Sequence, residues 1–234
     1  MKQYLFDVDG TLTPARQRIN PKFRDWFITF AAHNDVSLVS GSDYAKTVEQ
    51  LGSAITNSVN AVFSCSGNET WKGGERLWRN GWTLPEAAHE WLAEQLTASE
   101  FELRTGNHFE HRTGMVNFSI VGRNAEIDER EQYIQWDKRT NEREKIAIAF
   151  NLHFPELEAR IGGETGLDIS KKGLNKSQIV EVFAEEFELH FFGDDMGENG
   201  NDYPLMRAIV DNNRGRVYNV GNWTETWNLL QYGK

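Results

Sequence analysis

The sequence has few cysteines and no long apolar run. Its 234 residues include one cysteine, Cys65, so no disulfide can form within the chain, as is usual in a reducing compartment. No apolar run approaches the roughly 20 residues that a membrane-spanning helix needs. The N-terminal stretch MKQYLFDVDG turns acidic after a short apolar run, unlike a signal peptide. These absences lead us to expect a cytoplasmic protein that does not contact a membrane.

Basic residues are scarce relative to acidic ones. The chain has 25 lysines and arginines against 35 aspartates and glutamates, a net charge of −10. This excess of negative charge argues against nucleic acid as a partner. A protein of this charge that binds a phosphate needs a metal ion or a local cluster of arginines and lysines. Hydrophobic residues make up 39% of the chain and aromatic residues 12%, which predicts a packed core rather than disorder.

Strand and helix patterns alternate over the first third of the chain. Apolar runs typical of buried strands occupy 2–6, 36–40 and 61–64. Between them, apolar residues recur at helical spacing over 22–33 and 42–51. This alternation predicts a parallel sheet with right-handed crossover connections.

The middle of the chain has a different pattern. Short strands broken by Thr-Gly turns are predicted over 101–121, and a further hairpin over 159–170. Helices are predicted over 84–97, 126–138 and 140–152. We interpret this stretch as a smaller module of antiparallel strands and helices.

The α/β alternation returns after Gly173. Helices are predicted at 176–187, at 203–211 and after Thr224, and strands at 188–192 and 216–220. The helix at 176–187 rests on the helical spacing of Ile179, Val182, Phe183 and Phe187. We therefore predict a core of residues 1–82 and 172–234, interrupted by an inserted domain of residues 83–171.

Two aspartates follow the first predicted strand. Ligands of open α/β sheets bind beyond the carboxyl ends of the strands. Alternation along an extended chain places Asp7 and Asp9 on one face, with Val8 pointing away. One carboxylate can attack phosphorus, and the second can give a proton to the leaving oxygen. Because two close carboxylates repel each other, this chemistry calls for a divalent cation such as Mg²⁺. The plain alternative is a polar turn after a strand, and the apolar lead-in and following Gly-Thr disfavour it.

The stretch FDVDGTLT (6–13) resembles motif one of the haloacid dehalogenase (HAD) superfamily of phosphotransferases. The resemblance implies a Rossmann-like parallel sheet with an inserted α+β cap domain of a C2b-like type. It implies Asp7 as nucleophile and Asp9 as general acid and base. It also implies that Mg²⁺ is held by Asp7, by the backbone carbonyl of Asp9 and by Asp194, with Asp202 as a second acidic support.

The later HAD motifs follow in order. SLVSGSD (37–43) resembles motif two, which implies that Gly41 and Ser42 bind phosphoryl oxygens through a hydroxyl and backbone N–H groups. Lys176 stands where motif three has its lysine. FFGDDMGENGND (191–202) resembles motif four, which contains the acidic metal ligands.

A narrower resemblance covers nearly the whole chain. FDVDGTLTPAR (6–16), GSDYAKTVEQLG (41–52) and FEHRTGMVNFSIVGR (109–123) are similar to the eukaryotic-type phosphomannomutases. That family implies a grip on a sugar's distal phosphate, a contact to the sugar hydroxyls, a hexose 1,6-bisphosphate activator and a homodimer formed through the cap. The residues implied for the phosphate are Arg16, Arg112, Arg123 and Arg130, with Asn117 beside them, and Asp168 is implied for the hydroxyls.

Each arginine also has a plainer interpretation. Taken singly, Arg112, Arg123 and Arg130 are typical of surface or salt-bridged arginines, and Arg130 has an acidic neighbour at helical spacing. Their joint placement in the family pattern is what favours a phosphate site. A mutase that holds a bisphosphate needs such a second site, and arginine suits a phosphate dianion.

Some positions depart from the mutase pattern. Ser40 replaces a glycine at motif two, Gly166 replaces a serine two residues before Asp168, and the stretch 66–69 differs from the usual one. We expect a phosphohexose mutase that interconverts mannose 1-phosphate and mannose 6-phosphate, with glucose phosphates as a further pair. A Mg²⁺-dependent HAD sugar-phosphate phosphatase stays open as the alternative. A protein that binds phosphosugars without catalysis has no use for the Asp7 and Asp9 pair.

Overall fold

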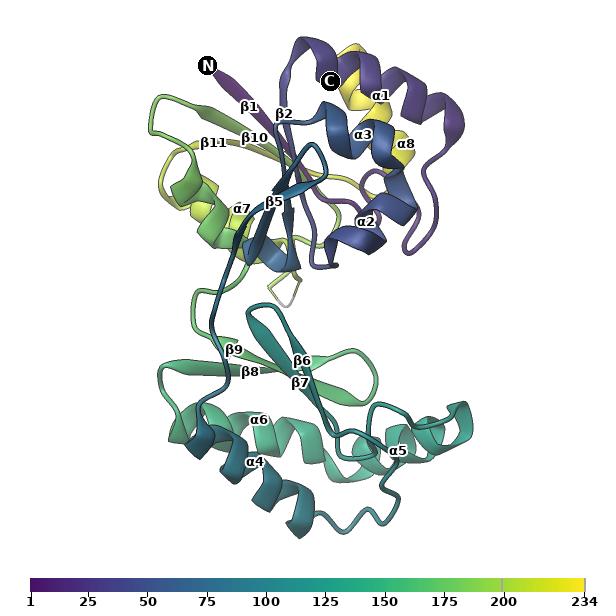
Figure 1. Cartoon of the computed structure of the whole chain (residues 1–234), viewed down its shortest axis with the longest axis vertical. Helices are drawn as coiled ribbons and strands as arrows, with labels where there is room; N and C mark the ends of the chain where they lie inside the picture. The colour runs from purple at the N-terminus through teal and green to yellow at the C-terminus, as the bar shows by residue number, and fades with distance from the viewer. Residues whose placement is uncertain (199, 234) are drawn as a thin grey trace. The chain divides into compact units, whose positions relative to one another are not determined.

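The computed structural model describes residues 1–198 and 200–233, which form two compact units. The first, here called the core unit, comprises Met1–Asn80 and the stretch that begins at Gly173. The second, the cap unit, comprises Gly81–Lys172. Figure 1 shows both, and each is described by itself. Among the described residues, no helix has the length and apolar character that a membrane crossing requires.

A seven-stranded sheet forms the centre of the core unit, in the order β11-β10-β1-β2-β3-β4-β5. The pairs from β11 to β3 are parallel, as the sequence predicted, and the pairs β3–β4 and β4–β5 are antiparallel. The strands are β1 (Lys2–Phe6), β2 (Asp35–Val39), β3 (Ala61–Ser64), β4 (Glu69–Lys72), β5 (Glu75–Arg79), β10 (Glu188–Gly193) and β11 (Gly215–Asn219).

Helix α1 (Pro21–His33) shows why the sequence folds in this way. The side chain of Asn20 caps it by accepting hydrogen bonds from the backbone N–H groups of Lys22 and Phe23. Its buried face carries Phe23, Phe27 and Ala31, spaced four residues apart. The ring of Phe27 packs edge-on against Phe6 at the end of β1, with ring centroids 5.2 Å apart. This contact anchors the end of β1, from which the aspartate motif continues.

Helices cover both faces of the core sheet (Figure 1). Phe6 and Phe192 point into the cluster beneath α1, and their neighbours Leu5 and Phe191 point into the opposite cluster with Leu205. With both faces buried, the edge at the carboxyl ends of the parallel strands is where a ligand can bind. The remaining helices are α2 (Tyr44–Leu51), α3 (Ser53–Ser58), α7 (Tyr203–Asp211) and α8 (Trp223–Tyr232).

Two predictions for the core unit were incomplete or wrong. The hairpin of β4 and β5 was not predicted; it turns at Gly73 and Gly74, which have φ of 56° and 85°. The long helix over 176–187 is wrong, because a 3₁₀ helix, η2 (Lys176–Val182), takes its place. The chain must turn before β10 starts at Glu188, so a helix cannot continue to Phe187, and Val182 is exposed rather than buried.

The cap unit is a four-stranded antiparallel sheet with helices on one face (Figure 1). Val116, Phe118, Leu167 and Ile169 pack into the apolar cluster beneath the helices. Because side chains alternate along a strand, the other face of the sheet carries the polar residues. The elements are α4 (Glu86–Ala98), β6 (Phe109–Arg112), β7 (Met115–Phe118), α5 (Ile127–Thr140), α6 (Glu142–His153), β8 (Leu157–Gly162) and β9 (Gly166–Lys171), in the sheet order β6-β7-β9-β8.

Candidate active site

Asp7 is the first residue after β1, at the carboxyl edge of the core sheet. Its backbone N–H donates to the carbonyl oxygen of Phe192 at 2.9 Å, which extends the pairing of β1 and β10 by one step. The side chain of Asp7 is buried. A carboxylate buried at this edge requires a partner, because burial without one strongly disfavours the charged form.

Lys176 is that partner. Its ammonium group donates to Asp7 Oδ1 at 2.6 Å, to Asp202 Oδ1 at 2.7 Å and to Asn201 Oδ1 at 2.6 Å. All three charged side chains are almost completely buried, with exposed fractions of 0% for Lys176, 5% for Asp7 and 0% for Asp202. Burial by itself would lower the pKa of Lys176, but the two carboxylates outweigh it and raise that pKa above its usual value. Lys176 is therefore a fixed positive charge.

Three carboxylates meet around this lysine. One oxygen each from Asp7, Asp194 and Asp202 lies within 4.8 Å of the other two. Burial raises the pKa of Asp7 to about 7, although Lys176 lowers it, and burial also raises the pKa of Asp194. With three carboxylates to one ammonium group, the ionised cluster carries more negative charge than one lysine can balance. Its donors are all hard oxygen atoms, a set that fits Mg²⁺ or a similar divalent cation.

Gly10 allows the aspartate loop to approach this cluster. Its φ of 75° is left-handed, and a Cβ built on it would overlap the carboxylate of Asp194. Any other residue at position 10 would displace the Asp194 carboxylate or the aspartate loop. The glycine of the FDVDG motif is thus required by both backbone conformation and space.

Asp9 lies outside the three-carboxylate cluster. Its Oδ1 accepts hydrogen bonds from Gln50 Nε2 at 2.7 Å and from the backbone N–H of Arg16 at 2.6 Å. Arg16 itself has a left-handed φ of 58°, and its side chain is exposed. Gln50, which is buried on α2 and holds Asp9 in place, was not predicted as a site residue, because no motif marks it.

The loop after β2 contains Ser40, Gly41 and Ser42. The backbone N–H of Ser40 donates to the carbonyl of Phe63 at 2.8 Å, which fixes the loop to β3. The Ser42 N–H donates to the Ser40 hydroxyl at 3.0 Å. Ser40 is buried, Ser42 is half-buried and Gly41 is exposed, so the loop presents its middle to solvent.

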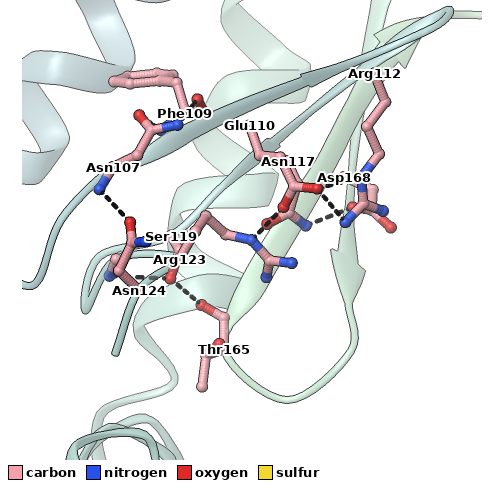
Figure 2. A network of polar contacts seen from close by, with 11 residues as sticks. Asn107, Phe109, Glu110, Arg112, Asn117, Ser119, Arg123, Asn124, Thr165 and Asp168 are labelled. Atoms are coloured by element: carbon pink, nitrogen blue, oxygen red, sulfur yellow. Dashed lines mark hydrogen bonds and ion pairs between the residues drawn. The ribbon is translucent and has the colours of Figure 1, made fainter. Parts of the chain in front are cut away.

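The polar face of the cap sheet carries two predicted arginines, joined by Glu110 (Figure 2). Arg112 donates to Glu110 Oε1 through Nε at 2.9 Å, and Arg123 donates to Oε2 through Nε at 2.5 Å. Hydrogen bonding to Arg112 and then to Arg123 lowers the pKa of Glu110, against the effect of burial. Sequence reasoning missed Glu110, although its alternation with Arg112 on β6 places both on one face.

Two other predicted cap residues lie on the same face of the sheet. Asn117 and Asp168 are register partners on β7 and β9, and the Asn117 amide donates to Asp168 Oδ1 at 2.6 Å (Figure 2). Arg130 pairs with Glu164 at 3.4 Å, not with a neighbour on its own helix. The predicted residues are divided between the two units. The core unit contains Asp7, Asp9, Arg16, Gly41, Ser42, Lys176, Asp194 and Asp202, and the cap unit contains Arg112, Asn117, Arg123, Arg130 and Asp168.

The core unit is a HAD-type fold. It combines a parallel sheet, an aspartate pair after the first strand and a buried lysine with an inserted cap. Solved structures of the HAD class share the fold. A haloacid dehalogenase-like hydrolase from Bacteroides thetaiotaomicron matches with a TM-score of 0.57 at 14% identity, covering 88% of this chain and 85% of that one. Trehalose-6-phosphate phosphatase of Aspergillus fumigatus matches with a TM-score of 0.56 at 18% identity, covering 98% and 90%.

The sequence narrows the class to one family. The family model described as eukaryotic phosphomannomutase matches residues 23–231. The phosphomannomutase of Saccharomyces cerevisiae is 34% identical over 244 residues, which covers 96% of this chain and 94% of that protein. The phosphomannomutase of Arabidopsis thaliana is 32% identical over 213 residues, which covers 87% and 86%. This chain belongs to the eukaryotic phosphomannomutase family.

Replacing Lys176 tests the buried ion pairs. Lys176→Met removes the positive charge and leaves Asp7 and Asp202 buried beside each other. We expect the free energy of unfolding without divalent cations to fall by about 3–5 kcal/mol, measured by urea denaturation. The control Lys22→Met, at an exposed position on α1, should change it by less than about 0.5 kcal/mol. Equal stability of the Lys176→Met and wild-type chains would contradict this account.

Proposed function

We propose that this protein is a phosphohexose mutase that interconverts mannose 1-phosphate and mannose 6-phosphate. The reaction proceeds through a phosphate carried by Asp7 and through a hexose 1,6-bisphosphate, which also serves as activator. Family membership supports this activity. In this proposal the core unit is the catalytic domain and the cap unit is the substrate-binding domain.

The single observation that carries the proposal is a second polar group besides the one around Asp7 and Lys176. The first group, in the core unit, would hold a phosphate together with a bound cation, and the second is the arginine group on the polar face of the cap sheet. A phosphatase acting on a monophosphate needs the first group alone. A mutase must also hold the second phosphate of the bisphosphate, and arginines suit that dianion in a chain whose net charge is −10.

In the first half-reaction, a carboxylate oxygen of Asp7 attacks the phosphorus of the donor phosphate. The new bond joins Asp7 to phosphorus, and the bond between phosphorus and the sugar oxygen breaks. The carboxyl group of Asp9 gives its proton to that sugar oxygen, and it takes a proton from the other hydroxyl in the return step. Lys176 holds Asp7 Oδ1, so the nucleophile is oriented before the substrate arrives. Gly41 and Ser42 bind the phosphoryl oxygens.

We assign the divalent cation to Asp7, Asp194, Asp202 and the backbone carbonyl of Asp9. Bound Mg²⁺ would neutralise the charge that the carboxylates and the phosphoryl oxygens bring together. The all-oxygen donor set and the excess of negative charge around Lys176 support this assignment. Asp202 is also paired with Lys176, so it contributes to the cluster chiefly as the acidic support behind the metal.

Arg112, Arg123 and Arg130 hold the distal phosphate in this proposal, and Arg16 is a further residue for the same ligand. The paired side chains of Asn117 and Asp168 bind the sugar hydroxyls. We also propose a cytoplasmic homodimer formed through the cap. Ile148 and Leu152, which lie one turn apart on α6 with exposed fractions of 56% and 79%, offer apolar surface for such a contact.

Phosphorus NMR separates the mutase from the phosphatase of the same fold. Mannose 1-phosphate is followed with the protein and Mg²⁺, with and without glucose 1,6-bisphosphate. We expect the bisphosphate to start conversion to mannose 6-phosphate, with little inorganic phosphate released, because water must not reach the phosphate on Asp7. Asp7→Asn is the negative control. Release of inorganic phosphate equal to the loss of sugar phosphate, both with and without the bisphosphate, would contradict the proposal.

The metal assignment predicts a shift of the melting temperature. Mg²⁺ at about 100 times its Kd stabilises the folded state by about 2.7 kcal/mol, which corresponds to roughly 5–10 °C for a chain of this size. Asp194→Asn should abolish most of the shift measured by calorimetry. Asp211→Asn removes an exposed carboxylate of the same unit and should retain it. A full shift in the Asp194→Asn protein would show that the ion binds elsewhere.

The second phosphate site predicts a selective loss in Arg123→Gln. Losing a charge-assisted hydrogen bond to the distal phosphate should lower mutase kcat/KM about 10–100-fold. Slow release of inorganic phosphate from the phosphorylated protein should change much less, because that step uses the core group. Arg139→Gln, at an exposed position on α5, is the control. Parallel losses in both steps would argue against a separate site for the distal phosphate.

A further inference from the structure

The turn that follows β3 has an unusual backbone. Cys65, Ser66 and Gly67 are consecutive residues with positive φ, of 50°, 59° and 87°. Residues other than glycine avoid this left-handed region because their Cβ atoms crowd the backbone. Two such residues in succession persist only where the surroundings fix them, and strain of this kind gathers at functional sites. We call Cys65, Ser66 and Gly67 the 65–67 turn.

Hydrogen bonds tie the 65–67 turn to the predicted phosphate-binding loop. The backbone N–H of Cys65 donates to the carbonyl of Ser42 at 2.8 Å, and that of Ser66 donates to the carbonyl of Ser40 at 2.8 Å. Both carbonyls flank Gly41. The left-handed backbone thus turns two successive N–H groups toward one neighbouring loop, an arrangement that fixes the position of that loop.

A third bond ties the turn to the helix that carries Lys176. The side-chain amide of Gln178 donates to the carbonyl of Ser66 at 2.8 Å. Gln178 is two residues beyond Lys176 on η2. Gly67 makes this packing possible, because a Cβ at that position would lie 2.9 Å from a side-chain carbon of Ile179. The turn therefore links the phosphate loop with the segment that positions the lysine beside Asp7.

These bonds leave the Ser66 hydroxyl beside the exposed middle of the phosphate loop. A Cβ built on Gly41 would lie 3.9 Å from Ser66 Oγ, and no other atom of the described residues would lie within 4 Å of it, apart from its chain neighbours. Ser66 is half-buried, and its hydroxyl makes no hydrogen bond to the residues that the structure describes. A polar group held by a strained backbone, yet without a partner in the described chain, is available to a ligand.

We propose that Ser66 is a further phosphate-binding residue, whose hydroxyl donates to an oxygen of the phosphoryl group held at the Ser40–Ser42 loop. The backbone of the 65–67 turn holds this hydroxyl beside the loop. The inference rests on the proposed function only in that a phosphoryl group binds at this loop; it holds for a mutase and for a phosphatase alike.

Three variants separate the hydroxyl from the backbone. Ser66→Ala removes the hydroxyl, and Ser66→Gly removes it while relieving the left-handed strain. Ser66→Asn keeps a hydrogen-bonding side chain on a residue that tolerates this conformation. Ser53→Ala, at an exposed position on α3, is the matched control. The measurement is the Kd of inorganic phosphate for the full chain with Mg²⁺, by isothermal titration calorimetry, together with the melting temperature.

Because a hydrogen bond to a charged group is lost, both Ser66→Ala and Ser66→Gly should weaken phosphate binding at least about tenfold. Ser66→Gly should melt no lower than the wild type, and Ser66→Asn should bind phosphate within about threefold of it. Wild-type affinity in Ser66→Gly would overturn the inference, whatever Ser66→Ala does, because the turn would then act through its backbone alone. An intact wild-type chain that binds no phosphate would overturn it too. Turnover of mannose 1-phosphate, measured separately, distinguishes either failure from a failure of the proposed function.

Discussion

The structure of the core unit depends on the buried ion pairs of Lys176. This one ammonium group joins Asp7 after β1, the start of η2, and Asp202 at the start of α7, three segments that are far apart in the sequence. Removing two carboxylates and an ammonium group from water is costly, and only close pairing offsets that cost. The pairs therefore add little net stability but hold the Asp7 side chain in place. They fix Asp7 in one orientation and leave the remaining negative charge of the cluster for a cation to balance.

Backbone conformation determines where the loops lie, as the ion pairs of Lys176 determine where the charged side chains lie. Gly10 allows the aspartate loop to lie against Asp194, and the 65–67 turn, which follows the neighbouring strand β3, holds the Ser40–Ser42 loop. On the cap sheet, Glu110 accepts hydrogen bonds from the Nε atoms of Arg112 and Arg123 and so holds the two arginines close together. In each case a residue that does no chemistry itself determines where a functional group lies, which is how a site is preorganised.

Much of the fold and of the candidate site could be predicted from the sequence, because the core unit alternates clear strand and helix patterns. The strand before Asp7 and the periodic face of α1 were predicted from periodicity alone, and the motif residues from their resemblance to a family. What local patterns miss is pairing between distant segments. Helical spacing at 176–187 could not show that β10 must begin at Glu188, and the hairpin of β4 and β5 has exposed residues without clear alternation. Gln50 and Glu110 were not predicted, because each matters through a hydrogen bond to a residue that only the fold brings close to it.

The central claim is that Asp7 carries a phosphate which it passes to a sugar hydroxyl, and that water is kept from it. Turnover of mannose 1-phosphate in water enriched in oxygen-18, with hexose bisphosphate present, tests this directly by mass spectrometry of the products. Transfer from Asp7 to a sugar hydroxyl uses no solvent oxygen, so the account predicts mannose 6-phosphate whose phosphate group contains no oxygen-18. Inorganic phosphate containing one oxygen-18 atom, formed as fast as mannose 1-phosphate disappears, would contradict it.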